Sequence, residues 1–302
     1  MYQLSIVKNI DAMKKIFTVA FIFHYLTCFG QAGSEIFLFD LKITDGQVIL
    51  SNGINITNHK GYDNQPFFHP SQPLIYYTSF NDSARSDIKY YNFEKKTTSN
   101  LTITHDREYS PTVTPDGKFI SCIIQRDNGN QDLGEYPING GEPEVLINNL
   151  KVGYHAWIDK DRLLLFVLVD STTNNLHYYN LALKKDTVIA INPGRSLHKI
   201  PGQNALSFIQ KNSGKDWTIR KFDITNGMIS AITPTIPGQE NLCWLQNNII
   251  LMSEGSRIFS FRVGIDKEWQ LVIVEGDSTM FKGVTRLATN SSNTKLAIVV
   301  SE

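Results

Sequence analysis

Three histidines are the residues of this 302-residue chain whose type is best suited to metal chemistry. Imidazole is a common ligand of divalent ions, so His69, His155 and His198 could hold such an ion if they met at one centre. With carboxylates nearby as general bases, that site would serve a carbohydrate-active lyase or hydrolase. The alternative is three separate histidines, and we expect no metal ion or other cofactor.

Sequence motifs of known catalytic sites are absent. The chain has no Cys-x-x-Cys, no His-Glu-x-x-His and no Gly-x-Ser-x-Gly, and its seven histidines are scattered. A catalytic role is therefore not indicated by motif, and a binding role is the expected one.

Nine polar and aromatic residues form the predicted ligand site. Each lies at or near the start of a short strand, and the strands recur along the chain. Such a mixture of acids, arginine and aromatic rings suits hydrogen bonding and stacking with a peptide or a sugar. The alternative is a solvated rim that binds no ligand. The predicted rim residues are Asp63, Asn64, Glu108, Tyr109, Tyr154, His155, Arg195, Glu240 and Asn241.

The strands that must position these residues recur about every 42 to 45 residues. In each repeat a short strand leads to a turn, an apolar strand follows, and an aromatic-rich strand such as Leu176 to Leu181 comes next. A strand-rich repeat of this period is typical of propeller blades. The apolar strands suit positions covered on both faces. The residues that mark the first strands are Phe68, Val113, Trp157, Lys199, Trp244 and Ala288.

The second repeat carries a family resemblance. Its segment Ser110 to Ile120 reads SPTVTPDGKFI, in which Gly117 supplies the positive φ of a tight turn. This segment resembles the WD40-like repeats of TolB-type six-bladed propellers, whose blades open on Ser-Pro-x-x-Ser-Pro-Asp-Gly-Lys. The resemblance implies that the first strands line an axial channel and that the residues leading into them ring one mouth. The small N-terminal α/β domain of TolB is not expected, because the repeats occupy the chain after residue 30.

The two ends of the chain supply complementary half repeats. Glu35 to Leu50 reads as a back half, and Gly283 to Ser301 reads as a front half. We therefore predict an all-β fold, a six-bladed β-propeller of four-stranded antiparallel blades whose last blade is closed by the N- and C-terminal strands. Such closure removes the free sheet edges that invite aggregation.

The first thirty residues read as a signal peptide. Lys14 and Lys15 precede the apolar run Ile16 to Phe23, which is shorter than the roughly 20 residues of a spanning helix. We therefore predict a signal peptide at 1–30, one propeller domain at 31–302, and a periplasmic or secreted protein with no membrane span after cleavage. A lipoprotein attached through Cys28 is the alternative, although Thr27 before it fits a lipobox poorly.

Charge and cysteine content narrow the function further. The chain has 29 basic and 29 acidic residues, so it lacks the basic footprint of a nucleic-acid binder. Cys122 and Cys243 fall in the second and fifth repeats, so we expect two buried thiols and no disulfide. We predict a non-enzymatic binding or scaffold module for a protein, peptide or glycan in the bacterial envelope. The alternative is the carbohydrate-active enzyme described above.

Overall fold

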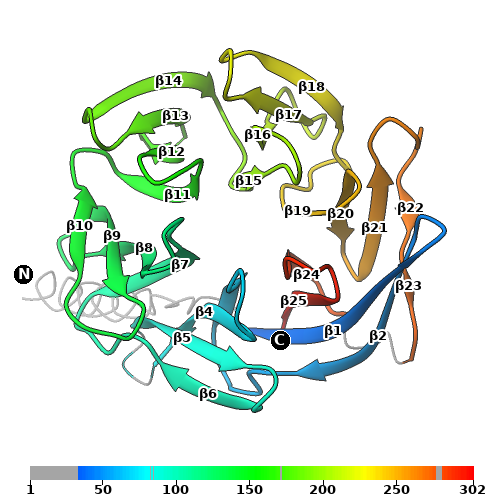
Figure 1. The fold of residues 1–302 in the computed structure, drawn as a ribbon, viewed down its shortest axis with the longest axis horizontal. Coiled ribbons are helices and arrows are strands. Elements are labelled where there is room, and N and C mark those ends of the chain that lie inside the picture. The colour runs from blue at the N-terminus through cyan, green and yellow to red at the C-terminus, as the bar shows by residue number, and fades with distance from the viewer. Residues whose placement is uncertain (1–32, 82, 84, 171, 277–280) are drawn as a thin grey trace, which may run out of the picture. The chain divides into compact units, whose positions relative to one another are not determined.

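The described residues form strands and turns only. The computed structural model describes residues 33–81, 83, 85–170, 172–276 and 281–302. Over these ranges it contains 25 strands in six sheets and no helix (Figure 1). None of the described segments is therefore a helix long and apolar enough to cross a membrane. The predicted signal peptide, residues 1–30, and Cys28 lie outside the described residues.

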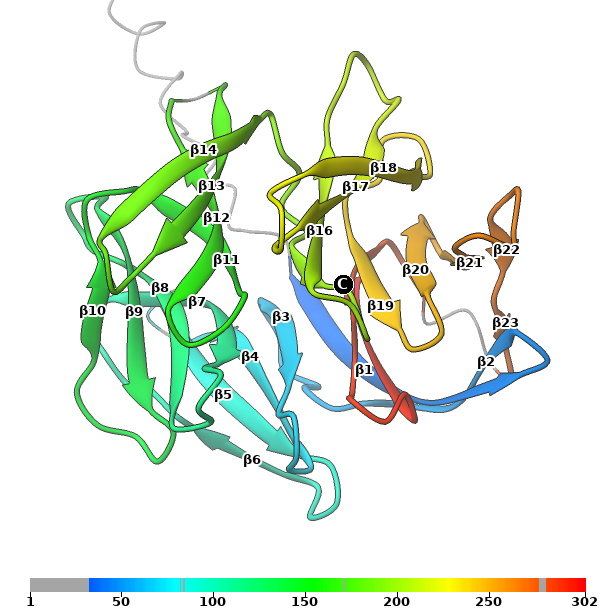
Figure 2. The same ribbon diagram turned by 45° about the horizontal axis from the view of Figure 1, so that its top comes forward.

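Five blades take their four strands in chain order, from the centre of the ring outward (Figures 1 and 2). Blade 1 consists of β3 (Asp63–Phe68), β4 (Leu74–Phe80), β5 (Ser86–Asn92) and β6 (Thr97–Asn100), and blade 2 of β7 (Arg107–Val113), β8 (Phe119–Gln125), β9 (Gln131–Pro137) and β10 (Glu144–Ile147). Blade 3 consists of β11 (Val152–Trp157), β12 (Arg162–Leu168), β13 (Asn174–Asn180) and β14 (Lys185–Ile191), and blade 4 of β15 (His198–Lys199), β16 (Ala205–Gln210), β17 (Thr218–Asp223) and β18 (Ile229–Pro234). Blade 5 consists of β19 (Leu242–Leu245), β20 (Ile249–Glu254), β21 (Arg257–Arg262) and β22 (Gln270–Leu271).

Strands from both ends of the chain make the sixth blade. From the channel outward it consists of β24 (Val284–Thr289), β25 (Lys295–Ser301), β1 (Ser34–Thr44) and β2 (Gln47–Asn55). Strands β1 and β25 pair antiparallel from Ser34 opposite Ser301 to Asp40 opposite Lys295. The predicted six-bladed propeller and its composite last blade are therefore confirmed.

One short strand lies in a different sheet from the one its position in the sequence indicates. In the sequence, residues 273 and 274 follow the strands of the fifth repeat and precede the sixth, but they form β23 (Ile273–Val274), which pairs with β2 of the sixth blade, in parallel. The backbone N–H of Glu275 also donates to the carbonyl of Leu50 at 2.8 Å. Blade 5 therefore ends at β22, and β23 with Glu275 lies along the outer edge of blade 6.

The hydrophobic core consists of six clusters, one between each pair of neighbouring blades. The second strand of every blade supplies the middle of its sheet, and its central residues are buried on both faces. This confirms the reading of the apolar runs as covered strands. Because the apolar area lies between blades, each blade depends on its two neighbours for stability.

The two cysteines of the described residues lie in different clusters. Cys122 packs between blades 1 and 2, and Cys243 packs between blades 5 and 6. Both are buried free thiols, as predicted. Burial raises the pKa of the Cys243 thiol to about 12, so this residue is a packing group and not a nucleophile.

Candidate functional site

A cavity of about 900 Å³ lies along the axis of the ring. All six blades line it, and each contributes only its first strand, the residues leading into that strand and the turn that follows. The volume falls within the range of ligand pockets, roughly 300 to 1,000 Å³. The channel implied by the family resemblance is therefore present as a cavity wide enough for a ligand.

Six residues at one equivalent position form a ring in the cavity wall. Five of them lie three residues before the last paired residue of their first strand, as Tyr154 does before Trp157, which pairs with Leu163. In blade 5 the pairing runs one residue further, to Leu245, and Asn241 lies three residues before Trp244, whose indole N–H donates to Ser207 of blade 4 as that of Trp157 donates to Ser121 of blade 2. All six residues line the cavity and are mostly polar, so they form one level of it. This channel ring comprises Gln65, Ser110, Tyr154, Ser196, Asn241 and Arg286.

β-Bulges help to bring the ring side chains to the channel. The first strands of blades 1, 2, 3 and 6 each carry a register shift at or beside the ring position. Gln65 and Ser110 adopt left-handed backbone angles, with φ of 59° and 56°. Gln65 Oε1 accepts from Thr78 Oγ1 at 2.9 Å and from the backbone N–H of Ser110 at 2.7 Å, which joins blade 1 to blade 2. Bulges of this kind redirect side chains next to functional sites.

Arg286 and Tyr154 meet across the channel. They come from blades 6 and 3, which lie opposite one another in the ring, and Arg286 Nη2 donates to the Tyr154 hydroxyl at 3.1 Å. The Arg286 guanidinium carbon also lies 5.3 Å from the centre of the Tyr154 ring. Burial acts to raise the pKa of Tyr154, but the charges of Arg286 and Arg195 outweigh it and lower that pKa. The electrostatic potential at this hydroxyl is therefore positive.

Arg195 belongs to an ion-pair cluster at the same level. Its Nε donates to Glu240 Oε1 at 2.6 Å, and Lys211 Nζ lies 2.7 Å from Glu240 Oε2. Burial acts to raise the pKa of Glu240, but the charges of Arg195 and Lys211 outweigh it and lower that pKa. Two cations share one carboxylate, so the cluster keeps a net positive charge beside Tyr154.

The three histidines named above all line the cavity but do not form a metal site. Among the residues described, no group of three His, Cys, Asp or Glu side chains is placed to hold a metal ion. His155 Nε2 lies 2.8 Å from Ser121 Oγ, and His198 Nε2 lies 2.9 Å from Ser196 Oγ. Burial lowers the pKa of His155 to about 4, and burial followed by the Arg286 charge does the same for His198. Both imidazoles are therefore neutral at pH 7.

His69 is held in one tautomer by its own turn. Its Nδ1 accepts from the backbone N–H groups of Ser71 at 3.1 Å and Gln72 at 3.0 Å, so Nδ1 carries no proton and the neutral ring carries its proton on Nε2. Burial lowers the pKa of His69, which favours this neutral form. The residue serves to shape the turn at the end of β3.

Two predicted rim acids are buried structural groups. Glu108 is fully buried and accepts from Thr104 Oγ1 at 2.6 Å and Tyr136 Oη at 3.0 Å. Asp63 is 1% exposed and lies 3.4 Å from His59 Nδ1. Burial raises the pKa of both carboxyls, and neither lines the cavity.

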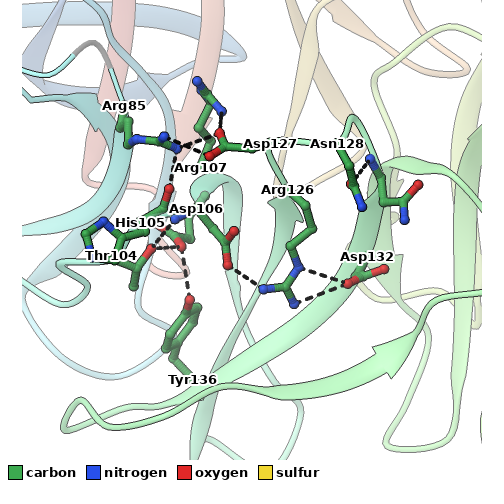
Figure 3. A network of polar contacts seen from close by, with 12 residues as sticks. Arg85, Thr104, His105, Asp106, Arg107, Arg126, Asp127, Asn128, Asp132 and Tyr136 are labelled. Atoms are coloured by element: carbon green, nitrogen blue, oxygen red, sulfur yellow. Dashed lines mark hydrogen bonds and ion pairs between the residues drawn. The ribbon is translucent and has the colours of Figure 1, made fainter.

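A network of ion pairs between arginines and aspartates lies in the region of Glu108. Asp127 bridges Arg85 of blade 1 and Arg107 of blade 2, at 2.9 and 3.0 Å (Figure 3). Arg126 in the same network reaches both Asp106 and Asp132. These ion pairs connect blades and loops, and each of the three aspartates is paired with an arginine. The network is therefore structural and is not an acidic binding site.

The structure brings four of the nine predicted rim residues to the cavity wall. They are Tyr154, His155, Arg195 and Asn241. Asn64 is 7% exposed and donates to Ser34 Oγ at 3.3 Å, while Tyr109 packs partly buried against the cluster between blades 2 and 3. Glu240 does not line the cavity, and it contacts a cavity residue through its ion pair with Arg195.

Sequence reasoning missed four of the six channel-ring residues, Gln65, Ser110, Ser196 and Arg286, and Arg286 is the charged one. No residue of the sixth blade is among the nine predicted rim residues. Arg286 follows Asn241 by 45 residues, which is the period of the repeat, so the spacing could have identified it. The marker predicted for this blade, Ala288, lies one residue before its equivalent position, Thr289, which pairs with Leu296.

Sequence comparisons give no assignment. No protein-family model matches the chain, and no curated protein matches it.

Comparison with solved structures shows the fold. TolB from Acinetobacter baumannii is 14% identical with a TM-score of 0.54, and the match covers 89% of this chain and 64% of that TolB. This chain thus spans less than two thirds of that protein. A putative TolB from Agrobacterium tumefaciens is 12% identical with a TM-score of 0.66, covering 90% of this chain and 99% of the other.

A chain of a nidogen/laminin complex is also similar, at 8% identity and a TM-score of 0.60, covering 89% of this chain and 98% of that one. At these identities the comparisons concern architecture alone. Together with the six blades and the composite closure, they show that residues 33–302 form a TolB-like six-bladed β-propeller.

Proposed function

We propose that the protein is an exported binding module whose axial channel holds a segment of a peptide or protein partner. The observation that carries the proposal is the cavity of about 900 Å³, into which each blade presents one residue of the channel ring. Five of these six residues, all but Arg286, are uncharged polar or aromatic side chains. Such groups donate hydrogen bonds to a peptide backbone and accept them from it, and they do not by themselves specify a chemical reaction.

The similar folds and the N-terminal sequence support this role. One of the similar structures is a nidogen/laminin complex, in which the propeller protein is seen with a protein partner. The apolar run after Lys14 and Lys15 supports export to the periplasm or the medium, since it reads as a signal peptide. A glycan is the other ligand class that the polar wall accommodates.

Selection of ligands from a random peptide library tests the proposal. Peptides that bind the purified propeller should lose binding to Asn241→Trp, because the larger side chain fills the cavity at the level of the channel ring. Leu183→Trp is the control, since Leu183 is 71% exposed in the turn before β14, away from the cavity. Circular dichroism and thermal unfolding establish that both variants fold.

Failure of the selection, or peptides that bind Asn241→Trp as tightly as the wild type, would overturn the proposal. In the second case the peptides occupy the outside of the ring.

A further inference from the structure

The arginine of the channel ring differs from nearly all the other arginines of the chain. Seven of the nine arginines pair with an aspartate or glutamate: Arg85, Arg107, Arg126, Arg162, Arg195, Arg257 and Arg262. Arg286 and Arg220 have no such partner within ion-pair distance among the described residues. Of these two, only Arg286 lines the cavity.

The hydrogen bonds of Arg286 leave most of its donors for another group. A guanidinium has five N–H donors, and within the described part of the chain one of them is used, the Nη2 donor to Tyr154. Because Tyr154 accepts this bond through its oxygen, the phenolic proton is a further donor at the same point. Charged and neutral donors thus converge on one level of the channel.

The charged side chains of the cavity wall sum to a positive charge. Its charged residues other than histidine are Arg195, Lys199 and Arg286, against the single acid Asp116. Asp116 lies in the exposed turn after β7, where its Oδ1 accepts from Thr114 Oγ1 at 2.7 Å. Glu240 is shared by Arg195 and Lys211. The part of the channel around Tyr154 therefore lacks a balancing anion among the described residues.

We propose that Arg286, with Tyr154 and Arg195, binds a carboxylate of a peptide that occupies the channel. The inference rests on the proposed function and adds the chemistry of the ligand. A planar guanidinium matches the two oxygens of a carboxylate, and charge-assisted hydrogen bonds of this kind are about twice as strong as neutral ones. Arg286 is half-buried and has no carboxylate within ion-pair distance among the described residues, so such a ligand would supply its counter-ion.

The carboxylate has two sources, a peptide C-terminus and an Asp or Glu side chain, and the test separates them. Fluorescein-labelled hexapeptide mixtures are prepared in three forms: free C-terminus without acids, amidated C-terminus with one Glu, and amidated C-terminus with Gln in its place. Binding is measured by fluorescence polarisation to the full chain and to Arg286→Gln. Arg220→Gln is the matched control, since it removes the other arginine that has no carboxylate partner.

The wild type and Arg220→Gln should bind one carboxylate-bearing mixture roughly tenfold or more tightly than the Gln amide mixture. Arg286→Gln should bind all three mixtures equally, with the affinity of the Gln amide. The favoured mixture identifies the source of the carboxylate.

The inference is overturned if the wild type does not discriminate, or if Arg286→Gln keeps the preference. If the uncharged peptides bind and Asn241→Trp blocks them, the proposed function is supported and the carboxylate site is contradicted. If no mixture binds, both proposals are contradicted. Binding of oligogalacturonate in place of every peptide mixture would show that the carboxylate belongs to a sugar acid and would overturn the peptide assignment.

Discussion

At the scale of single residues, the channel wall combines neutral histidines with positively charged arginines. His155 is 7% exposed, and burial holds its pKa at about 4 against an ordinary value of 6.5. The unfolded chain therefore takes up a proton on this residue as the pH falls below 6.5, while the folded chain does so only near pH 4. Stability that is fully present above pH 6.5 is lost across this window, by roughly 3 kcal/mol at most.

Replacement of His155 by Gln should remove that dependence. The free energy of unfolding of the variant, minus that of the wild type, should rise as the pH falls from 6.5 to 4. Urea denaturation at several pH values measures the difference, with the exposed His105→Gln as control. A constant difference between wild type and His155→Gln over this range would show that His155 is not held neutral.

The pairing of Arg286 with Tyr154 predicts a change in the titration of the phenol. Because two guanidinium charges lower the pKa of Tyr154, Arg286→Gln should raise it. The ultraviolet absorbance of the phenolate gives the measurement, after subtraction of the titration of Tyr154→Phe. Arg220→Gln should leave the titration unchanged, and an unchanged curve in Arg286→Gln would show that the two groups do not meet.

The sequence predicted part of the channel wall: four of the nine predicted rim residues line the cavity, and the three predicted acids do not. Repeat spacing placed Tyr154, Arg195 and Asn241 on the cavity wall. It could not separate Glu108 from Ser110, because the two lie in one short strand and a bulge decides which side chain faces the channel. Burial of Asp63 and Glu108 likewise depends on partners distant in the sequence, such as Tyr136 for Glu108.

At the scale of the elements, two tryptophans each form a side-chain hydrogen bond to a serine of the neighbouring blade, and we call each of these bonds a lock. Trp157 Nε1 of blade 3 donates to Ser121 Oγ of blade 2, and Trp244 Nε1 of blade 5 donates to Ser207 Oγ of blade 4, both at 2.8 Å. The two locks occupy equivalent positions, so they are a repeated device of this fold. Strand order and the apolar middle strands were predictable from the repeat, whereas these contacts between blades were not.

Removal of one hydroxyl should weaken its lock. In Ser121→Ala the indole N–H of Trp157 loses its acceptor and His155 Nε2 loses its partner, and together these losses should lower the free energy of unfolding by about 1–3 kcal/mol. Ser256 lies exposed in the turn between β20 and β21, and Ser256→Ala should change stability by less than about 0.5 kcal/mol. Chemical denaturation of the two variants compares them, and equal stability would show that neither contact of the Ser121 hydroxyl stabilises the fold.

At the scale of the whole molecule, the sixth blade closes the ring. The backbone N–H of Glu302 donates to the carbonyl of Gly33 at 3.1 Å, and β1 pairs with β25 along seven residue pairs. Residues from the two ends of the described chain are thus neighbours in one sheet. The complementary half repeats predicted this closure, but the transfer of β23 to the same sheet was not visible in the sequence.

A circular permutant tests the closure. A short Gly-Ser linker should join Glu302 to Gly33, and new ends should be placed at the exposed turn near Leu183. We expect this permutant to unfold cooperatively with nearly the stability of residues 33–302 in the original order. Deletion of Lys295 to Glu302 removes the second strand of blade 6 and should abolish cooperative unfolding, and a truncated chain that unfolds like the permutant would contradict the closure.

The channel is also where the account of function is most open to direct test. A crystal structure of the propeller with a selected peptide should show that peptide in the axial cavity, with a carboxylate about 2.7–2.9 Å from the Arg286 guanidinium. A peptide bound on the outer strands, or one that lies in the cavity with an uncharged group against Arg286, would contradict it.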